Sequence, residues 1–276
     1  MTGNPATNNG IWHGRVAIVT GGSSGLGRAM ARALVAGGAR VVIGARGADK
    51  LQAVADELGH LDGEIMAVPC DITRQADVDL LFAQTIERFG RLDMLVNNAG
   101  RSARGAIIDT PPEEFTAMMD LNLIALVRCS RAAMAPLLAA RGHLVNIGSL
   151  AGKTAAPYMG AYAATKHAVS AYSQQLRLEL AEQGLHVLLV SPGPIARDEP
   201  RSYAADKVAA VPPAARRPGG GAKVRLINAN HLADQILVAC RRRQPELVVP
   251  GRARLVFALS QLSPRLGDWV IRKMTS

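Results

Sequence analysis

A tyrosine and a lysine near the middle of the chain have the types and the spacing that proton transfer requires. Tyr162 and Lys166 are four residues apart in a segment with a helical pattern, so both side chains can lie on one face of a helix. An unperturbed phenol has a pKa of about 10, and a neighbouring ammonium favours its ionised form. Ser149 follows a predicted buried strand, from which its hydroxyl could hydrogen-bond a carbonyl oxygen and stabilise a forming oxyanion. These groups could together move a proton during the reduction of a carbonyl.

The tyrosine–lysine spacing is weak evidence when it stands alone, because such pairs also occur on ordinary helix surfaces. Tyr158 and Tyr172 lie close by, but neither has a lysine four residues further on. Tyr162 is therefore the preferred proton donor.

A glycine-rich turn that could bind a dinucleotide follows the first predicted strand. Residues 20–27 read Thr-Gly-Gly-Ser-Ser-Gly-Leu-Gly and lead directly into a helical pattern. Glycines let the backbone approach a pyrophosphate, and the amides at a helix N-terminus stabilise the anion. The spacing differs from the literal G-x-G-x-x-G pattern, and the Lys-Ser/Thr ending of a mononucleotide loop is absent. The position between strand and helix favours a dinucleotide site more than the glycines themselves do.

Short apolar runs that alternate with longer amphipathic segments must position these residues. Strands are expected over residues 16–19, 41–43, 65–68, 94–96, 144–147, 187–190 and 247–249. Helices are expected over residues 26–36, 50–58, 78–88, 115–138, 162–182 and 232–242. Strands that are almost wholly apolar indicate a sheet covered on both faces. The pattern predicts an α/β fold with a Rossmann-type doubly wound parallel sheet, and a ligand site at the carboxyl ends of its strands.

The chain of 276 residues is long enough for one domain that carries an N-terminal tail, an insertion and a C-terminal extension. Residues 1–12 are expected to form a flexible tail, and residues 13–252 the nucleotide-binding domain. Residues 194–230 interrupt the regular rhythm with five prolines and a glycine triplet, and form either a lid over the site or a surface loop. Residues 253–276 form an apolar and basic C-terminal extension, expected to be helical and broken at Pro264.

The C-terminal extension contains the apolar residues Phe257, Leu262, Leu266 and Trp269 among cations. Packing on the core or on another subunit is the commoner outcome for such a segment, and peripheral contact with a membrane surface is the alternative. No apolar run reaches the roughly 20 residues that a membrane-spanning helix needs.

Charge and cysteine content restrict the classes of function. The net charge is +10, but the cations are scattered, so a solvated surface explains them better than nucleic-acid binding does. Cys70, Cys129 and Cys240 have no spacing that suggests a zinc site or a redox dithiol, so no metal is expected. The N-terminus lacks the features of a secretory signal. These observations favour a cytoplasmic location.

Several motifs, taken in order, resemble those of the classical short-chain dehydrogenases/reductases. Residues 20–27 match the pattern Thr-Gly-x-x-x-Gly-x-Gly of the cofactor turn, and residues 97–100 read Asn-Asn-Ala-Gly. The other matches are Asp71, Asn122, Ser149, Tyr162, Lys166 and the pair Pro192-Gly193. Each match has an ordinary explanation alone, such as a helix cap, a turn residue or a buried amide. The ordered series, over about residues 13–250, indicates the family.

The resemblance implies roles for particular residues. Ser149, Tyr162, Lys166 and Asn122 correspond to the catalytic set, in which the serine binds the substrate oxygen, the lysine also holds the nicotinamide ribose and the asparagine supports a water chain to the lysine. Together with Arg46, which follows the second predicted strand, the predicted cofactor-binding residues are Gly21, Ser23, Ser24, Gly25, Leu26, Gly27, Asp71, Ile72, Asn98, Ala99, Gly100, Tyr162, Lys166, Pro192, Gly193 and Ile195. The resemblance also implies a homodimer or homotetramer.

The residues after the second predicted strand bear on the choice of cofactor. NAD-binding folds place a carboxylate there to accept hydrogen bonds from the ribose hydroxyls. This chain has Gly44-Ala45-Arg46 instead, and the guanidinium of Arg46 suits a 2′-phosphate. NADP(H) is therefore favoured, with NAD(H) as the alternative.

The sequence predicts an NADP(H)-dependent oxidoreductase that interconverts a small-molecule carbonyl compound and its alcohol, with Tyr162 as the general acid and base. It does not name the substrate. The family commonly has a threonine shortly after Pro-Gly, but Arg197 follows here, which either brings a cation near the cofactor or pairs with a neighbouring acid. The alternative function is a catalytically silent NADP(H)-binding sensor or scaffold, against which the intact Ser149, Tyr162 and Lys166 argue.

Overall fold

The strands form one parallel sheet whose order reverses near its middle. The computed structural model describes residues 10–196, 211–216, 221 and 225–275, and within these residues a seven-stranded sheet has the order β3-β2-β1-β4-β5-β6-β7. The strands are β1 (Val16–Thr20), β2 (Arg40–Ala45), β3 (Glu64–Pro69), β4 (Met94–Asn97), β5 (His143–Ile147), β6 (His186–Pro192) and β7 (Glu246–Val249).

Strand composition explains the burial of the sheet. Every residue of β1, β4 and β6 is buried, as expected for strands that are covered on both faces. The chain runs outward from β1 to β3 and then returns to place β4 on the other side of β1. Ligands of such sheets bind where the order reverses, at the carboxyl ends of the strands.

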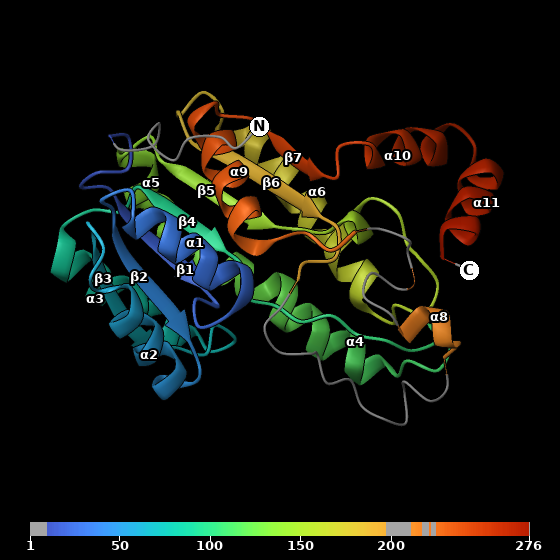
Figure 1. Ribbon diagram of the computed structural model, residues 1–276, viewed down its shortest axis with the longest axis horizontal. Helices are drawn as coiled ribbons and strands as arrows, with labels where there is room; N and C mark the ends of the chain where they lie inside the picture. Colours follow the sequence, from blue (N-terminus) through green and yellow to red (C-terminus); the bar gives the residue numbers. More distant parts are fainter. Residues whose placement is uncertain (1–9, 197–210, 217–220, 222–224, 276) are drawn as a thin grey trace.

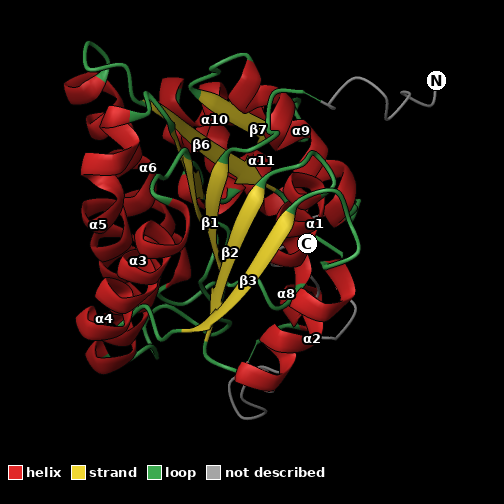
Figure 2. Cartoon of the chain, turned by 90° about the vertical axis from the view of Figure 1, so that its left-hand side faces the viewer, coloured by secondary structure: helices red, strands yellow, loops and turns green. Residues whose placement is uncertain are grey.

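Two helical layers enclose the sheet (Figure 2). α1, α2 and α9 pack on one face, whereas α3, α5 and α6 pack on the other. The helices are α1 (Gly25–Val35), α2 (Ala48–Leu58), α3 (Gln75–Phe89), α4 (Pro112–Met119), α5 (Ala125–Ala139), α6 (Tyr162–Leu180), α8 (Pro213–Arg216), α9 (Ala229–Arg241), α10 (Ala253–Leu262) and α11 (Pro264–Thr275). The predicted Rossmann-type doubly wound sheet is confirmed.

The helix predicted over residues 115–138 differs from the observed one in its middle. A π-helical turn, Asp120–Ile124, joins α4 to α5 within a continuous helical segment. A π turn inserts one residue into the hydrogen-bonding pattern and rotates the side chains that follow it. Asn122 lies in this turn and is buried, so the prediction of one regular helix missed the feature that orients Asn122.

The same helical segment is the one described helix that is long and apolar enough to cross a membrane. It covers Pro112–Ala139, although no apolar run of membrane-spanning length was expected in this chain. Ala125, Cys129, Ala133 and Leu137 pack into the core beside the sheet, as the residues of a core helix in a globular domain do. We interpret the segment as a core helix for that reason.

The C-terminal extension consists of two helices. α10 ends before Pro264, and Pro264 is the first residue of α11, so the predicted break is observed. Proline is favoured at this position because the backbone N–H of the first helical residue makes no hydrogen bond within the helix. The two helices lie beyond the β7 end of the sheet, with the C-terminus on the side of α8 (Figure 1).

The amino ends of β5 and β6 hold a buried histidine pair. His143 Nδ1 lies 2.8 Å from His186 Nδ1, and His186 Nε2 lies 2.8 Å from the carbonyl oxygen of Gln244. The carbonyl can only accept, so His186 carries its proton on Nε2 and accepts the Nδ1 proton of His143. Cys240 Sγ lies within 4.8 Å of this pair, a grouping that cysteine spacing could not indicate because its members come from three elements.

The histidine pair predicts a loss of stability in acid. Burial, together with His186 and Arg243, lowers the pKa of His143 to about 3, and burial also lowers the pKa of His186. Unfolded histidines bind a proton at about pH 6.5, so the unfolded chain holds more protons between about pH 6.5 and 3, and stability falls as the pH decreases through that window. We expect urea unfolding to give a free energy lower by about 1–2 kcal/mol at pH 5 than at pH 7.5.

The variants that test this expectation separate the pair from other histidines. His143→Gln should flatten the dependence of the unfolding free energy on pH between about 5 and 7.5, whereas His60→Gln, at an exposed position, should leave it unchanged. Equal slopes for the wild-type protein and His143→Gln would assign the acid sensitivity to other groups.

Candidate active site

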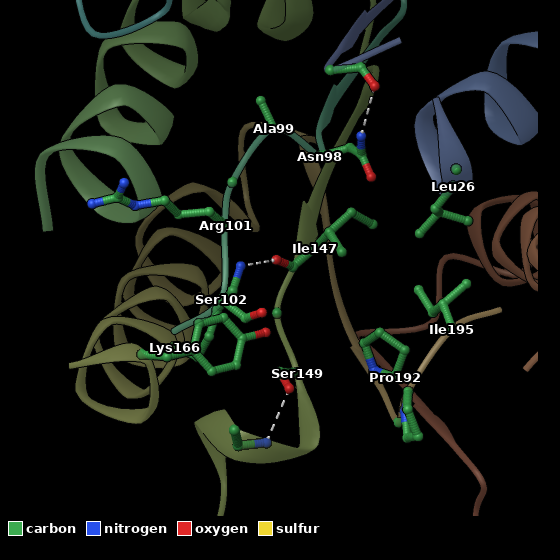
Figure 3. A pocket seen from close by; sticks show the side chains of 18 of the residues that line it. Leu26, Asn98, Ala99, Arg101, Ser102, Ile147, Ser149, Lys166, Pro192 and Ile195 are labelled. Atoms are coloured by element: carbon green, nitrogen blue, oxygen red, sulfur yellow. Dashed lines mark hydrogen bonds between the residues drawn. The ribbon is translucent and has the colours of Figure 1, made fainter. Parts of the chain in front are cut away.

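A cavity of about 1360 Å³ opens at the carboxyl ends of the strands. It extends from the ends of β2 and β3, past the glycine turn after β1, to the residues that follow β5 and β6. Part of its lining is drawn in Figure 3. This is the edge at which the sequence analysis expected a ligand.

The glycine turn is shaped by two close approaches of the backbone. Gly21 has a φ of +66°, in the left-handed region, and a Cβ at Gly27 would lie 2.1 Å from the carbonyl oxygen of Gly21. Gly21 and Gly25 line the cavity, but Gly27 does not. The prediction that Gly27 contacts the cofactor is therefore not supported by its position, because Gly27 instead lets α1 pack against the turn.

The N-terminus of α1 has the properties of an anion site. Ser24 is the N-cap residue, but its side chain makes no capping hydrogen bond, and Ser23, Ser24, Gly25 and Leu26 line the cavity. A Cβ added at Gly25 would have no neighbouring atom within 4 Å, so the space beside the turn is open. Uncapped amides at the positive end of a helix fit the pyrophosphate of a dinucleotide.

Hydrogen bonds from the segment that follows β4 hold the glycine turn in place. Thr20 Oγ1 accepts the backbone N–H groups of Asn98 and Ala99 at 3.0 and 3.1 Å. Asn98 Nδ2 donates to the carbonyl oxygens of Thr20 and Gly21, and one of these bonds is drawn in Figure 3. Asn98 therefore supports the turn with its side chain while also lining the cavity. Thr20, the first residue of the predicted motif, supports the turn without lining the cavity.

Cations gather where β2 ends. Arg46 and Lys50 line the cavity there, and no carboxylate other than that of Asp71 lines it among the described residues. Asp71 Oδ1 accepts the backbone N–H and the hydroxyl of Thr73, and these hydrogen bonds hold the pKa of the Asp71 carboxyl below its usual value. Lys50 was not among the predicted site residues, because its position inside a helix shows no motif.

The proposed proton-transfer residues meet beside β5. Tyr162, the first residue of α6, lines the cavity together with Lys166. Lys166 Nζ lies 6.0 Å from the centre of the Tyr162 ring and donates to the carbonyl oxygen of Ile147 at 2.7 Å (Figure 3). Lys166 is only 7% exposed. The ammonium is thus a fixed positive charge near the phenol.

Ser149 enters the cavity from a short 3-10 turn, Leu150–Gly152. Its Oγ accepts the N–H of Ala151 at 3.1 Å (Figure 3), an arrangement that leaves the hydroxyl proton available for a ligand oxygen. A Cβ at Gly152 would lie 2.5 Å from the carbonyl oxygen of Lys166. The turn is therefore packed directly on α6, which holds Ser149 in position relative to Lys166.

Asn122 lies behind the cavity rather than in it. Its side chain accepts the N–H of Arg101 and donates to the carbonyl oxygen of Arg101 and to Thr165 Oγ1, at distances of 2.9 to 3.0 Å. It is 1% exposed and does not line the cavity. Through these bonds it joins the segment after β4 to α6, and its position next to Gly100 keeps that segment close to Lys166.

All of the remaining predicted cofactor residues line the cavity. These are Ile72, Ala99, Gly100, Pro192, Gly193 and Ile195. Ile195 is fixed by a bridge to Ile227. Arg197 and most of the 194–230 insertion lie outside the described residues.

Residues that sequence reasoning did not assign to the site complete the cavity wall. Arg104, Met159, Arg216 and Leu226 line it, as do six residues of the C-terminal extension. Arg101 also contributes, but its guanidinium is directed toward α4, where Nε donates to Met118 Sδ (Figure 3). These contacts join segments far apart in the sequence, so no motif could have revealed them.

A doubly wound sheet with a glycine turn, an open helix N-terminus and a tyrosine–lysine pair is the arrangement expected of an oxidoreductase that binds a dinucleotide. The sequence profile of the short chain dehydrogenase family matches residues 15–207. The chain belongs to the short-chain dehydrogenase/reductase family, as its motifs indicated.

Individual relatives agree with this assignment. An uncharacterised oxidoreductase of Staphylococcus aureus is 38% identical over 180 residues, which cover 65% of this chain and 77% of the relative. A dehydrogenase/reductase SDR family protein 7-like of Anopheles gambiae is 30% identical over 268 residues, 95% of this chain and 83% of its own.

Solved structures have the same fold. A short-chain dehydrogenase from Streptomyces avermitilis has a TM-score of 0.78 and 29% identity, and covers 92% of this chain and 95% of its own. A short-chain dehydrogenase/reductase from Burkholderia phymatum in complex with NAD has a TM-score of 0.82 at 24% identity over the same shares.

Proposed function

We propose that the protein is an NADP(H)-dependent oxidoreductase that interconverts a carbonyl compound and its alcohol, with Tyr162 as the general acid and base. The observation that carries the proposal is that Ser149, Tyr162, Lys166 and the glycine turn line one cavity. An intact set of proton-transfer residues beside an anion-binding turn argues for catalysis rather than for a sensor or scaffold that only binds dinucleotide.

The residues of the chain would divide the work on the substrate oxygen. A bound reduced nicotinamide would supply the hydride. Ser149 donates its hydroxyl proton in a hydrogen bond to the carbonyl oxygen, and Tyr162 transfers its phenolic proton to the same oxygen as negative charge develops there. Lys166 stabilises the resulting phenolate electrostatically, and the carbonyl of Ile147 orients its ammonium.

The cations at the end of β2 support the preference for NADP(H). Arg46 offers a planar pair of donors to a 2′-phosphate, and Lys50 adds a second positive charge at the same wall of the cavity. The carboxylate that would repel a 2′-phosphate is absent from the end of β2, which reads Gly-Ala-Arg. Asp71 would accept a hydrogen bond from the adenine amino group.

The family also suggests an assembly. We expect a homodimer or homotetramer that forms through the outer surfaces of α6 and of the helical segment made of the π turn and α5. Ile124, at the end of the π turn, and Leu178, on α6, are exposed. Exposed apolar side chains on two neighbouring helices fit a subunit contact.

A carbonyl panel tests the proposed activity. Purified protein should consume NADPH with at least one aldehyde or ketone, and with NADH more slowly, as followed by the absorbance of the reduced nicotinamide. Ser149→Ala should lower kcat by about a hundredfold, since one oxyanion donor is lost. Saturable NADPH binding without turnover across the panel would favour the sensor or scaffold, and equal rates with NADH would overturn the cofactor preference.

A further inference from the structure

The C-terminal hairpin, which we define as α10 and α11 (residues 253–275), has little contact with the rest of the domain. Among its residues only Gly267 is buried. A Cβ at Gly267 would lie 2.6 Å from Ser260 Cα, so the two helices pack closely on each other at this point. The hairpin is a unit of its own rather than an extra layer of the core.

The inner side of the hairpin forms part of the cavity wall. Val256 and Phe257 from α10, and Ile271 and Met274 from α11, line the same cavity as Tyr162. Four apolar side chains at this wall suit an apolar ligand.

The outer side of the hairpin exposes large apolar side chains. Leu262 is 83% exposed and Trp269 is 58% exposed. Leu255 and Leu266 are exposed as well. Leu255 and Leu262 are seven residues apart on α10, and Leu266 and Trp269 are three residues apart on α11, so each pair shares one face of its own helix. Single exposed leucines are ordinary, but four large exposed apolar side chains within two short helices indicate a binding face.

Cations alternate with these apolar residues along the hairpin sequence. All of them are exposed, and the only acidic residue among residues 252–275 is Asp268. Lys273 Nζ lies 5.1 Å from the centre of the Trp269 ring. The cations are Arg252, Arg254, Arg265, Arg272 and Lys273. Leucine and tryptophan between arginines and lysines is the composition of helices that rest on anionic lipid.

We propose that the C-terminal hairpin binds an anionic lipid surface with its outer side. Charge decides between this partner and a second copy of the chain. The chain carries a net charge of +10, so a second copy would bring further positive charge to a basic face, whereas an anionic bilayer neutralises it and also accepts the leucines and Trp269.

The proposed function extends this inference to the substrate. Because the inner side of the hairpin lines the cavity, binding at a bilayer places the cavity beside the lipid. The substrate class is then an apolar carbonyl compound dissolved in the membrane. This second step rests on the proposed function, whereas binding to lipid does not.

Co-sedimentation with vesicles tests the binding without any assay of activity. The wild-type protein should sediment with vesicles that contain about one-third phosphatidylglycerol, bind vesicles of pure phosphatidylcholine far less, and be released partly by salt. Trp269 gives a second readout, because Trp12 is 3% exposed and the chain has two tryptophans. A blue shift of the tryptophan fluorescence on binding should therefore report that Trp269 enters the lipid.

Two matched variants separate the hairpin from the general positive charge. Leu262→Gln/Arg265→Gln removes one exposed leucine and one exposed arginine from the hairpin, and Leu80→Gln/Arg88→Gln removes the same pair from α3. We expect the hairpin variant to bind phosphatidylglycerol vesicles about tenfold more weakly or worse, and the α3 variant to bind within about twofold of wild type. Circular dichroism and thermal melting verify that both variants are folded.

Three results would overturn the inference. They are wild-type binding that does not depend on phosphatidylglycerol, equal weakening by the two variants, and a hairpin variant that loses subunits in light scattering while its lipid binding is unchanged. The last result would identify the face as a contact between copies of the chain. Vesicle binding with no reduction of membrane-dissolved ketones would leave the docking surface intact and count against the substrate class alone.

Discussion

Replacement of Tyr162 with phenylalanine is expected to lower kcat by about a thousandfold, a typical loss when a general acid is removed. The change deletes one oxygen and keeps the ring, so the packing of Tyr162 against Ala151, Met159 and Ala163 is preserved. Ser149 would still hydrogen-bond the substrate oxygen, but no group would deliver the proton. The dissociation constant for NADPH should change by no more than about threefold, because the glycine turn and the N-terminus of α1, rather than the phenol oxygen, would bind the pyrophosphate.

Tyr172→Phe is the matched control for this variant. Tyr172 lies on the same helix, and it has no lysine four residues further on. Its substitution should leave kcat within about twofold of wild type. The measurements are steady-state kinetics and fluorescence titration with NADPH. A Tyr162→Phe enzyme that retains more than about a tenth of the wild-type kcat would refute the role assigned to Tyr162.

Replacement of Arg46 with alanine is expected to weaken NADPH binding by about 10- to 100-fold and to leave NADH binding within about twofold. The estimate corresponds to the loss of one charged hydrogen-bonding group, about 1.5–3 kcal/mol. Only NADPH carries the phosphate that Arg46 would contact, so the selectivity should fall by the same factor. Isothermal titration with both dinucleotides measures the two constants.

A second arginine provides the control for Arg46→Ala. Arg74 pairs with Asp77 at the start of α3 and does not line the cavity. Arg74→Ala removes the same charge from the protein, so it reports any effect of net charge on the binding of an anionic ligand. If Arg46→Ala weakens NADPH and NADH binding equally, the assignment of Arg46 to the 2′-phosphate is wrong.

The sequence predicted those parts of the structure that depend on local patterns. Apolar runs such as residues 187–190 identified strands of a covered parallel sheet, and Pro264 marked the division of the C-terminal extension. The π turn at Asp120–Ile124 was missed because the apolar pattern continues through it, and one inserted residue in a hydrogen-bonding pattern changes no residue type.

The candidate site divides in the same way. Motifs identified Ser149, Tyr162 and Lys166, which the structure brings to one cavity. The bond from Lys166 to the carbonyl of Ile147 was invisible, because every residue has a carbonyl and only the fold selects one. Gly27 was assigned to the ligand since its spacing fitted the motif, but spacing does not distinguish a glycine that faces a ligand from one that faces the backbone.

The contact between Gly27 and the carbonyl of Gly21 affects the thermodynamics of the anion site. With no room for a side chain between them, β1, the turn and α1 move together as one body. The amides at the start of α1 are then already ordered before an anion binds. Their conformational entropy is lost when the chain folds, so ligand binding does not have to order them. Dinucleotide binding should accordingly be accompanied by little change in the amide hydrogen exchange of this segment beyond the residues that contact the phosphates.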